Sequence, residues 1–276
     1  MKTLVIGATG YIGSAVAEAL VERGHEVVAL SRSGVEGGQY EVRVGDLTDP
    51  TSPAGAAAGV DAVVHVAPPP GDEQAGKAAL AALLDSGARV VYTSGVWVLG
   101  ASGDTPLGED APTNPLPIVG YRPRLEQQVL TAGGVVLRPG IVHGRGGGIP
   151  SMLVGWAKED GAGRYAGAVT TRWPMVHVDD LAELFALAVE SAEPRHRAAR
   201  RVGGGRLHRR AGRRSRPGSR RPGPSPPVAH RRRGRGRAVR GRPGPGPDRD
   251  LHSHPQVGRL EPHHPTALTD LLTGSY

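Results

Sequence analysis

The sequence of 276 residues contains no cysteine. Disulfide bonds and thiolate metal sites are therefore excluded. No apolar run approaches the roughly 20 residues needed to span a bilayer. Lys2 is followed at once by a short apolar run and a glycine turn. A secretion signal would instead have a basic segment followed by a longer apolar segment. We therefore expect a cytoplasmic protein that binds no metal and no membrane.

Lysine and acidic residues become scarce in the last third of the chain. Residues 1–193 contain 13 Lys and Arg against 22 Asp and Glu, whereas residues 194–276 contain 21 Arg, no Lys and four Asp and Glu. The net charge of +8 therefore belongs to the C-terminal part alone. We expect an acidic globular domain over residues 1–193 and a chain of different character after it.

Residues 195–247 contain no acidic residue and no aromatic residue. A segment of Arg, Gly, Pro, Ala, Ser and His cannot bury enough apolar surface to offset chain entropy. It could be an arm that binds nucleic acid through phosphates, a linker, or a GC-rich gene read in the wrong frame. Because its basic residues are all Arg with no aromatic for base stacking, we favour the frameshift. We therefore expect a disordered or frameshifted segment over 194–260. A short helix is expected separately over 261–276.

Apolar runs and helical patterns alternate through the first half of the chain, which predicts a parallel sheet with helices on both faces. The expected strands cover residues 3–6, 26–30, 40–44, 62–66, 89–93 and 134–137. The expected helices cover residues 11–22, 76–86, 124–131 and 179–192. The fold class is therefore α/β, with a doubly wound parallel sheet.

Three glycines at a spacing of three separate the first expected strand from the first expected helix. Glycines let the backbone approach a diphosphate, and the helix N-terminus supplies N–H groups and a positive dipole end. The alternative is a plain glycine-rich turn. The cradle predicts cofactor contacts from Gly7, Thr9, Gly10, Tyr11, Ile12 and Gly13.

With this G-x-x-G-x-x-G spacing, the chain resembles the short-chain dehydrogenase/reductase superfamily, in its extended or atypical branch of NAD-dependent epimerases and dehydratases. The resemblance covers roughly residues 1–193. It implies a Rossmann-like domain with a small C-terminal substrate lobe, to which residues 146–174 contribute and which is incomplete here. It also implies a small-molecule substrate and a possible homodimer.

Ser31 and Arg32 follow the second expected strand, where an acidic residue often holds the ribose of NAD. An arginine can bind the adenosine 2′-phosphate or stack on adenine, so we expect NADP in preference to NAD. The resemblance implies that Asp46 and Leu47 contact the adenine ring. The alternative for Asp46 is a cap on the next turn.

Four further cofactor contacts rest on the resemblance: Ala67, Thr93, Pro139 and Gly140. His65 is interpreted as a packed strand residue. In the motif Val176-His177-Val178-Asp179 we expect Asp179 to cap the following helix, and His177 either faces the substrate or holds the turn.

The family's catalysis implies a tyrosine as general acid/base, a lysine four residues on, and a Ser or Thr that orients the substrate oxygen. Tyr121 is the natural candidate, but Leu125 stands four residues after it. If Glu126 sets the register instead, Arg122 takes the lysine place and Ile118 the tyrosine place.

The catalytic candidates are Tyr121, Ser94 and Arg122, although Ser94 falls one residue early. Arg122 can supply charge but does not readily give up a proton. We expect an NAD(P)-dependent oxidoreductase or epimerase/dehydratase that acts on a small hydroxyl or carbonyl compound. The alternative is a redox-sensing dinucleotide binder without turnover, and a more distant one is nucleic-acid binding through the Arg-rich segment.

Overall fold

The computed structural model describes residues 1–34, 40–49, 51–68, 73–103, 107–163, 172–191 and 199–202. The predicted disordered or frameshifted segment after residue 202, and with it the predicted helix over 261–276, lies outside the described residues. Part of the expected substrate lobe, residues 164–171, lies outside them as well.

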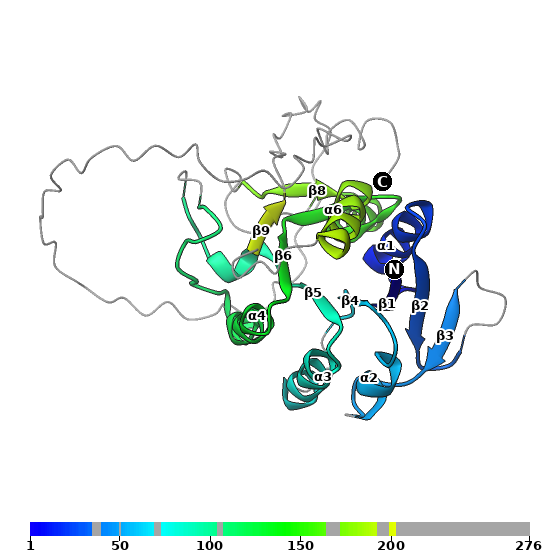
Figure 1. Ribbon diagram of the computed structural model, residues 1–276. Coiled ribbons are helices and arrows are strands. Elements are labelled where there is room, and N and C mark those ends of the chain that lie inside the picture. The colour runs from blue at the N-terminus through cyan, green and yellow to red at the C-terminus, as the bar shows by residue number, and fades with distance from the viewer. Residues whose placement is uncertain are drawn as a thin grey trace, which may run out of the picture. The chain divides into compact units, whose positions relative to one another are not determined.

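Within these described ranges, seven parallel strands form one sheet in the order β3-β2-β1-β4-β5-β6-β9 (Figure 1). Their bounds are β1 Lys2–Ile6, β2 Glu26–Ser31, β3 Glu41–Val44, β4 Ala62–His65, β5 Arg89–Thr93, β6 Val135–Pro139 and β9 Ala199–Val202. The direction of strand addition reverses between β1 and β4, and ligands bind doubly wound sheets at the carboxyl ends beside such a reversal.

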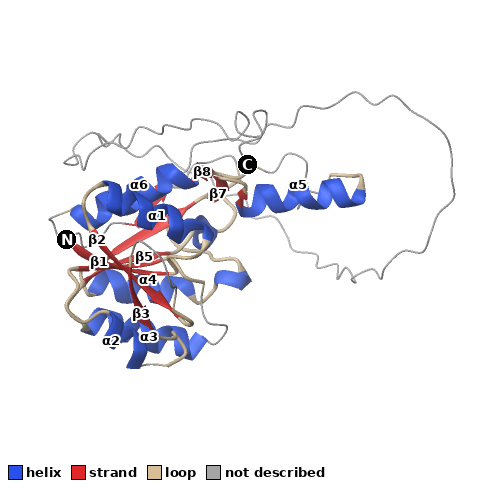
Figure 2. Ribbon diagram, turned by 90° about the vertical axis from the view of Figure 1, so that its right-hand side faces the viewer, coloured by secondary structure: helices blue, strands red, loops and turns tan. Residues whose placement is uncertain are grey.

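Helices cover both faces of this sheet (Figures 1 and 2). Helices α1 (Tyr11–Glu22) and α6 (Val178–Glu190) lie together on one face. The other face carries α2 (Thr51–Ala56), α3 (Glu73–Asp85) and α4 (Arg122–Thr131). The predicted α/β class and doubly wound parallel sheet are confirmed.

The central strands are apolar without alternation because both of their faces are buried. All four residues of β4 and all five residues of β6 are buried. Val64 of β4 packs in the core beneath α1 and α6, whereas its neighbour Val63 packs in the core on the opposite face. The sheet therefore separates two apolar cores, one beneath each layer of helices.

A second, smaller sheet pairs β7 (Ile141–Gly144) with β8 (Met175–His177) in parallel. Helix α5 (Gly148–Asp160) follows β7 after a glycine-rich turn. Two short 3₁₀ helices, η1 (Val96–Leu99) and η2 (Pro117–Val119), lie between β5 and α4. The sequence analysis did not predict α2, α5, β7 or β8.

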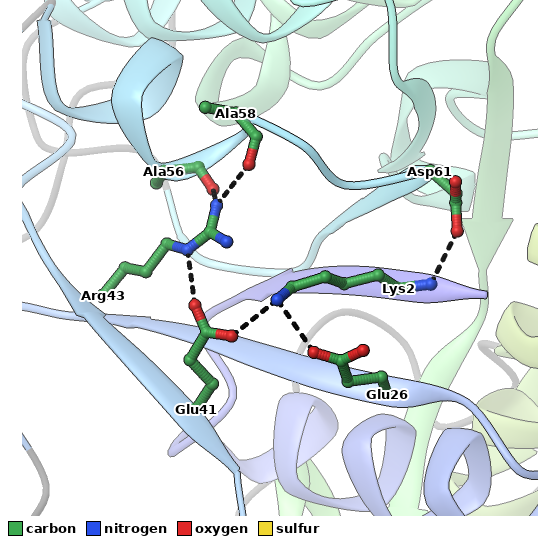
Figure 3. A network of polar contacts seen from close by, with 7 residues as sticks. All are labelled: Lys2, Glu26, Glu41, Arg43, Ala56, Ala58 and Asp61. Carbon is green, nitrogen blue, oxygen red and sulfur yellow. Dashed lines mark hydrogen bonds and ion pairs between the residues drawn. The ribbon is translucent and has the colours of Figure 1, made fainter.

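Polar side chains join the amino-terminal ends of β1, β2 and β3 (Figure 3). Lys2 Nζ lies 2.8 Å from an oxygen of Glu26 and 2.7 Å from an oxygen of Glu41. Arg43 Nε donates to the other Glu41 oxygen over 2.9 Å. The hydrogen bond from Lys2, followed by that from Arg43, lowers the pKa of Glu41. This network occupies the edge of the sheet opposite the carboxyl ends.

Strand β9 extends the sheet beyond the boundary at residue 193 that we expected for the globular domain. Residues 199–202 pair in parallel with β6, with Ala199 opposite Val136 and Val202 opposite Pro139. A strand at a sheet edge is held by main-chain hydrogen bonds, which any non-proline side chain allows. Regular structure therefore reaches four residues of the segment whose composition predicted disorder.

Candidate functional site

A cleft of about 530 Å³ lies at the carboxyl ends of β1, β2 and β4, beside the reversal of strand order. It is the place where a doubly wound sheet binds its ligand. Most of the residues expected to bind the cofactor line it: Gly7, Thr9, Gly10, Tyr11, Ile12, Gly13, Ser31, Arg32, Asp46, Leu47 and Ala67.

The glycine turn between β1 and α1 is too crowded for side chains. Gly7 has φ +95°, and a Cβ on it would lie 2.9 Å from the amide nitrogen of Ala67. A Cβ on Gly13 would lie 1.9 Å from the carbonyl oxygen of Gly7. The glycines therefore allow helix α1 to lie directly against the end of β1, with bare backbone facing the cleft.

Helix α1 begins at this turn, and Gly10 caps it without a side-chain hydrogen bond. The first N–H groups of a helix have no acceptor within the helix, and the N-terminus carries the positive end of the dipole. Gly10 N donates to Gly7 O over 2.9 Å, which holds the turn closed. Backbone of this kind fits a diphosphate group, so the residues present suit a dinucleotide cofactor.

Arg32 and Asp46 stand at the other end of the cleft, after β2 and β3. Thr48 donates to one carboxylate oxygen of Asp46 through its backbone N over 2.8 Å and through its hydroxyl over 2.9 Å. These bonds lower the pKa of Asp46, and the positive charge of Arg32 adds a smaller effect in the same direction. Asp46 thus caps its own turn while also lining the cleft.

The side chain of Tyr11 joins the glycine turn to the segment after β7. Its hydroxyl donates to the carbonyl oxygen of Gly144 over 2.8 Å. A Cβ on Gly147 would lie 2.3 Å from the Tyr11 ring, so the ring packs flat against glycine backbone. The hydroxyl of Tyr11 therefore donates its hydrogen bond to the backbone of Gly144, although Tyr11 also lines the cleft.

Thr93, Pro139 and Gly140 are not among the residues that line this cleft. Thr93 and Pro139 are the last residues of β5 and β6, and Gly140 follows β6, further along the same edge of the sheet. A Cβ on Gly140 would lie 2.4 Å from the carbonyl oxygen of Pro174, so glycine is needed there for packing against the chain that enters β8. Cofactor contact by these three residues stays a prediction.

Three buried polar atoms at the ends of β4 and β5 have no hydrogen-bond partner in the described part of the chain: His65 Nδ1, Thr93 Oγ1 and Ser94 Oγ. Ser94 is 3% exposed and His65 is 7% exposed. An unsatisfied buried polar group costs about 1–3 kcal/mol. The ends of β4 and β5 therefore offer hydrogen-bonding capacity that a ligand can use.

His65 packs edge-on against Tyr92, with ring centroids 5.6 Å apart. Burial, with a smaller contribution from the nearby charge of Arg122, lowers the pKa of His65 to about 4. Burial raises the pKa of Tyr92 to about 12. Both side chains are therefore uncharged at neutral pH. The sequence analysis treated His65 as a packed strand residue, and it did not anticipate an unpartnered ring nitrogen.

Tyr121 and Arg122 stand at the start of α4 and contact each other. Arg122 Nε lies 3.4 Å from the Tyr121 hydroxyl oxygen. Arg122 Nη1 would lie 3.5 Å from a Cβ on Gly95, the residue after Ser94. The structure therefore brings the three catalytic candidates to one region, at the carboxyl end of β5.

The two alignments considered for the tyrosine-lysine pair place their non-matching residues in different environments. Leu125, four residues after Tyr121, is buried in the core on the α3 and α4 face. Ile118, four residues before Arg122, is 72% exposed. Of the two arginines in α4, Arg122 lies beside Gly95, the residue after Ser94, whereas Arg124 is exposed.

A buried ion pair that the sequence analysis did not identify holds α4 against β6. Arg138 Nη2 lies 2.6 Å from a carboxylate oxygen of Glu126, with the two side chains 8% and 3% exposed. Arg138 Nε also donates to Glu126, over 3.1 Å. The available signal was Arg138, a charged residue inside the otherwise apolar sequence of β6. The pair ties α4, the helix that begins with Arg122, to strand β6.

The expectation that Asp179 caps helix α6 is wrong. His177 is the N-cap residue, and its Nδ1 accepts a hydrogen bond from the backbone N of Asp179 over 3.2 Å. The Asp179 carboxylate instead lies 2.6 Å from Arg145 Nε. His177 therefore holds the turn, and an imidazole nitrogen here takes the role that usually falls to a carboxylate or hydroxyl oxygen.

In the described residues, no group of three or more His, Asp or Glu side chains is arranged to hold a metal ion. Across the same residues, none of the helices combines the length and apolar character needed to cross a membrane.

Comparison with known proteins agrees with this geometry. Residues 3–199 match the model of the NAD dependent epimerase/dehydratase family. The chain is 32% identical over 225 residues to 2-alkyl-3-oxoalkanoate reductase of Stenotrophomonas maltophilia, covering 70% of this chain and 67% of that protein. It is also 32% identical over 214 residues to an uncharacterized protein, C2A9.02, of Schizosaccharomyces pombe, covering 69% and 71% of the two chains.

Solved structures show the same fold. The crystal structure of gox2253 is 31% identical, with a TM-score of 0.61 over 74% of this chain and 70% of that one. UDP-glucose 4-epimerase of Thermus thermophilus, solved with NAD, is 25% identical, with a TM-score of 0.61 over 74% and 78% of the two chains. With its glycine cradle, its strand order and a family match over residues 3–199, this chain belongs to the NAD-dependent epimerase/dehydratase family.

Proposed function

We propose that the chain is an NADP-preferring oxidoreductase that acts on a small hydroxyl or carbonyl compound. The observation that carries the proposal is the cleft that joins the glycine turn at Gly7 to Arg32. Its two ends fit the two charged parts of NADP, the diphosphate and the adenosine 2′-phosphate. Arg32 makes no ion pair with any carboxylate of the described chain, although its charge acts on Asp46.

The residues at the ends of β4 and β5 support chemistry next to that cleft. When bound, NADPH would supply a hydride to a substrate carbonyl carbon. The buried hydroxyl of Ser94 is available to hold the substrate oxygen, because it has no partner in the described chain. Tyr121 is the candidate proton donor, and Arg122 beside it supplies positive charge without giving up a proton. The name of the Stenotrophomonas relative supports reduction in preference to epimerisation or dehydration.

A carbonyl panel with purified protein tests this proposal. We expect oxidation of NADPH, followed by its absorbance, with at least one small ketone or aldehyde. Tyr121→Phe lowers kcat/KM by roughly 100-fold or more, the usual loss for a general acid. Tyr40→Phe is the matched control, since Tyr40 packs against the core beneath α1 and α6. Full activity of Tyr121→Phe, or binding of neither nucleotide, contradicts the proposal.

A second candidate is a dinucleotide-binding protein without turnover, as in redox sensing. It is favoured by the residues at the family's catalytic positions: Leu125 stands at the lysine position if Tyr121 is the tyrosine, and Ile118 stands at the tyrosine position if Arg122 takes the place of the lysine. Tight NADPH binding, together with no oxidation across the panel and no epimerised or dehydrated product, selects this candidate.

A further inference from the structure

Arg122 is a half-buried guanidinium whose hydrogen bonding within the described residues is incomplete. Its one hydrogen bond goes to the neutral hydroxyl of Tyr121, over 3.4 Å. Glu126, the carboxylate one turn further along α4, is bound by Arg138. A guanidinium has five N–H donors, and a partly desolvated charge without a counter-charge is costly. Arg122 is therefore suited to bind an anion from outside the described chain.

The groups around Arg122 are neutral and partly unsatisfied. Its Nη1 would lie 3.5 Å from a Cβ on Gly95, so the lack of a side chain there leaves it directly beside the backbone after Ser94. The buried hydroxyl of Ser94 and Nδ1 of His65 have no partner in the described chain. The charge of Arg122 acts to lower the pKa of both His65 and Tyr92.

We propose that Arg122 and Ser94 together recognise the carboxylate of an oxo-acid substrate. A carboxylate has about four lone-pair sites, so it can accept two hydrogen bonds from a guanidinium and one from a hydroxyl at the same time. This inference rests on the proposed oxidoreductase function and names its substrate class. It makes the role of Ser94 more specific: the Ser94 hydroxyl binds an oxygen of the substrate carboxylate, and not the oxygen of the carbonyl that is reduced.

The reaction leaves the carboxylate unchanged. The hydride of NADPH adds to the carbonyl carbon, and one proton adds to the carbonyl oxygen. The products are a hydroxy acid and NADP⁺, so atoms and electrons balance. A neutral ketone or an ester undergoes the same reduction but leaves the Arg122 charge without a partner, which costs binding energy in both the ground state and the transition state.

Acetoacetate and its methyl ester provide a matched pair of probes, since they differ in the charge that Arg122 would bind. In the wild-type protein we expect kcat/KM for acetoacetate to exceed that for the ester by at least roughly tenfold, the usual effect of a hydrogen bond to a charged group. Arg122→Gln brings this ratio close to one, and Arg122→Lys retains part of it. Arg124→Gln, two residues along α4 and exposed, keeps the wild-type ratio.

Two outcomes overturn the inference: a wild-type ratio near one, or a ratio unchanged in Arg122→Gln. An unchanged ratio with equal losses for acid and ester would assign Arg122 to the cofactor. If NADPH binds but neither compound is reduced, the proposed function fails separately. Calorimetric titration of acetoacetate into the NADPH complex then decides the inference. Binding that Arg122→Gln abolishes supports it, and equal binding to both proteins or no binding to either overturns it.

Discussion

Arg122 donates a hydrogen bond from Nε to the hydroxyl of Tyr121, over 3.4 Å, although the two residues are adjacent in the chain. Tyr121 is the N-cap of α4 and Arg122 is the first residue of the helix. Consecutive residues of a continuing helix point about 100° apart, but these two side chains are long enough to meet at the helix start. The phenol and the cation thus come together without the one-turn spacing that the resemblance implies.

Gly13→Ala is expected to damage folding and cofactor binding together. The new Cβ would lie 1.9 Å from the carbonyl oxygen of Gly7, so α1 must move away from the end of β1. Overpacking of this kind costs about 1–3 kcal/mol, and the displaced helix N-terminus no longer faces the diphosphate. Urea unfolding and NADPH titration measure the two effects.

Gly55→Ala is the control for this substitution. A Cβ on Gly55 in helix α2 meets no other atom within 4 Å, so the change replaces only a flexible helical residue. We expect the free energy of unfolding to rise by about 0.5–1 kcal/mol, with NADPH affinity unchanged. Equal effects from both glycine substitutions would contradict the close approach at Gly13.

Glu126→Gln tests the buried ion pair with Arg138. Removal of one charge leaves the other buried and uncompensated, which costs about 3–5 kcal/mol of stability. The exposed pair between Glu73 and Lys77, 2.7 Å apart on α3, is the comparison. Glu73→Gln is expected to cost about 0.5 kcal/mol or less. Similar costs in denaturant unfolding would show that Arg138 is solvated and does not position α4.

Folding stability is expected to fall as the pH drops from about 6.5 towards 4, with His65 as one cause. Its pKa is about 4 in the folded chain and near 6.5 when unfolded. The unfolded state therefore binds more protons in this window, so stability rises with pH across it. Urea unfolding at pH 7, 5.5 and 4.5 should show a smaller loss for His65→Leu than for the wild type. Parallel losses would mean that His65 is accessible to water.

Arg32→Glu is expected to reverse the preference between the two nicotinamide cofactors. Arg32 lines the cleft after β2, and a carboxylate there repels a 2′-phosphate but accepts hydrogen bonds from ribose hydroxyls. The ratio of the dissociation constants of NADPH and NADH should increase by at least roughly tenfold, one charge-assisted interaction being worth that much. An unchanged ratio would show that Arg32 does not bind the 2′-phosphate.

The fold was predictable from the sequence because its signals are local. The strand expected over 89–93 and the helix expected over 11–22 agree with β5 and α1. Other boundaries shift by a few residues, as where β6 runs on to Pro139. Strands β7 and β8 escaped prediction because each is short, and their pairing joins residues more than 30 positions apart.

Side-chain partnerships were less predictable because they depend on which helix face meets which strand. Glu126 lies in a largely polar helix sequence, and only the packing of α4 on β6 buries it against Arg138. The cap on α6 was assigned to Asp179 by residue type, yet Arg145 binds that carboxylate and leaves the cap to His177. In both cases, contacts between residues distant in the sequence determined which partner each charged side chain has.

Isothermal titration of the folded protein with NADPH and with NADH tests the central claim most directly. If the backbone between Gly7 and Gly13 holds a diphosphate, both nucleotides bind at one site per chain, NADPH more tightly, and Gly13→Ala weakens both. A well-folded sample that binds neither nucleotide would contradict the assignment of this cleft and every role derived from it.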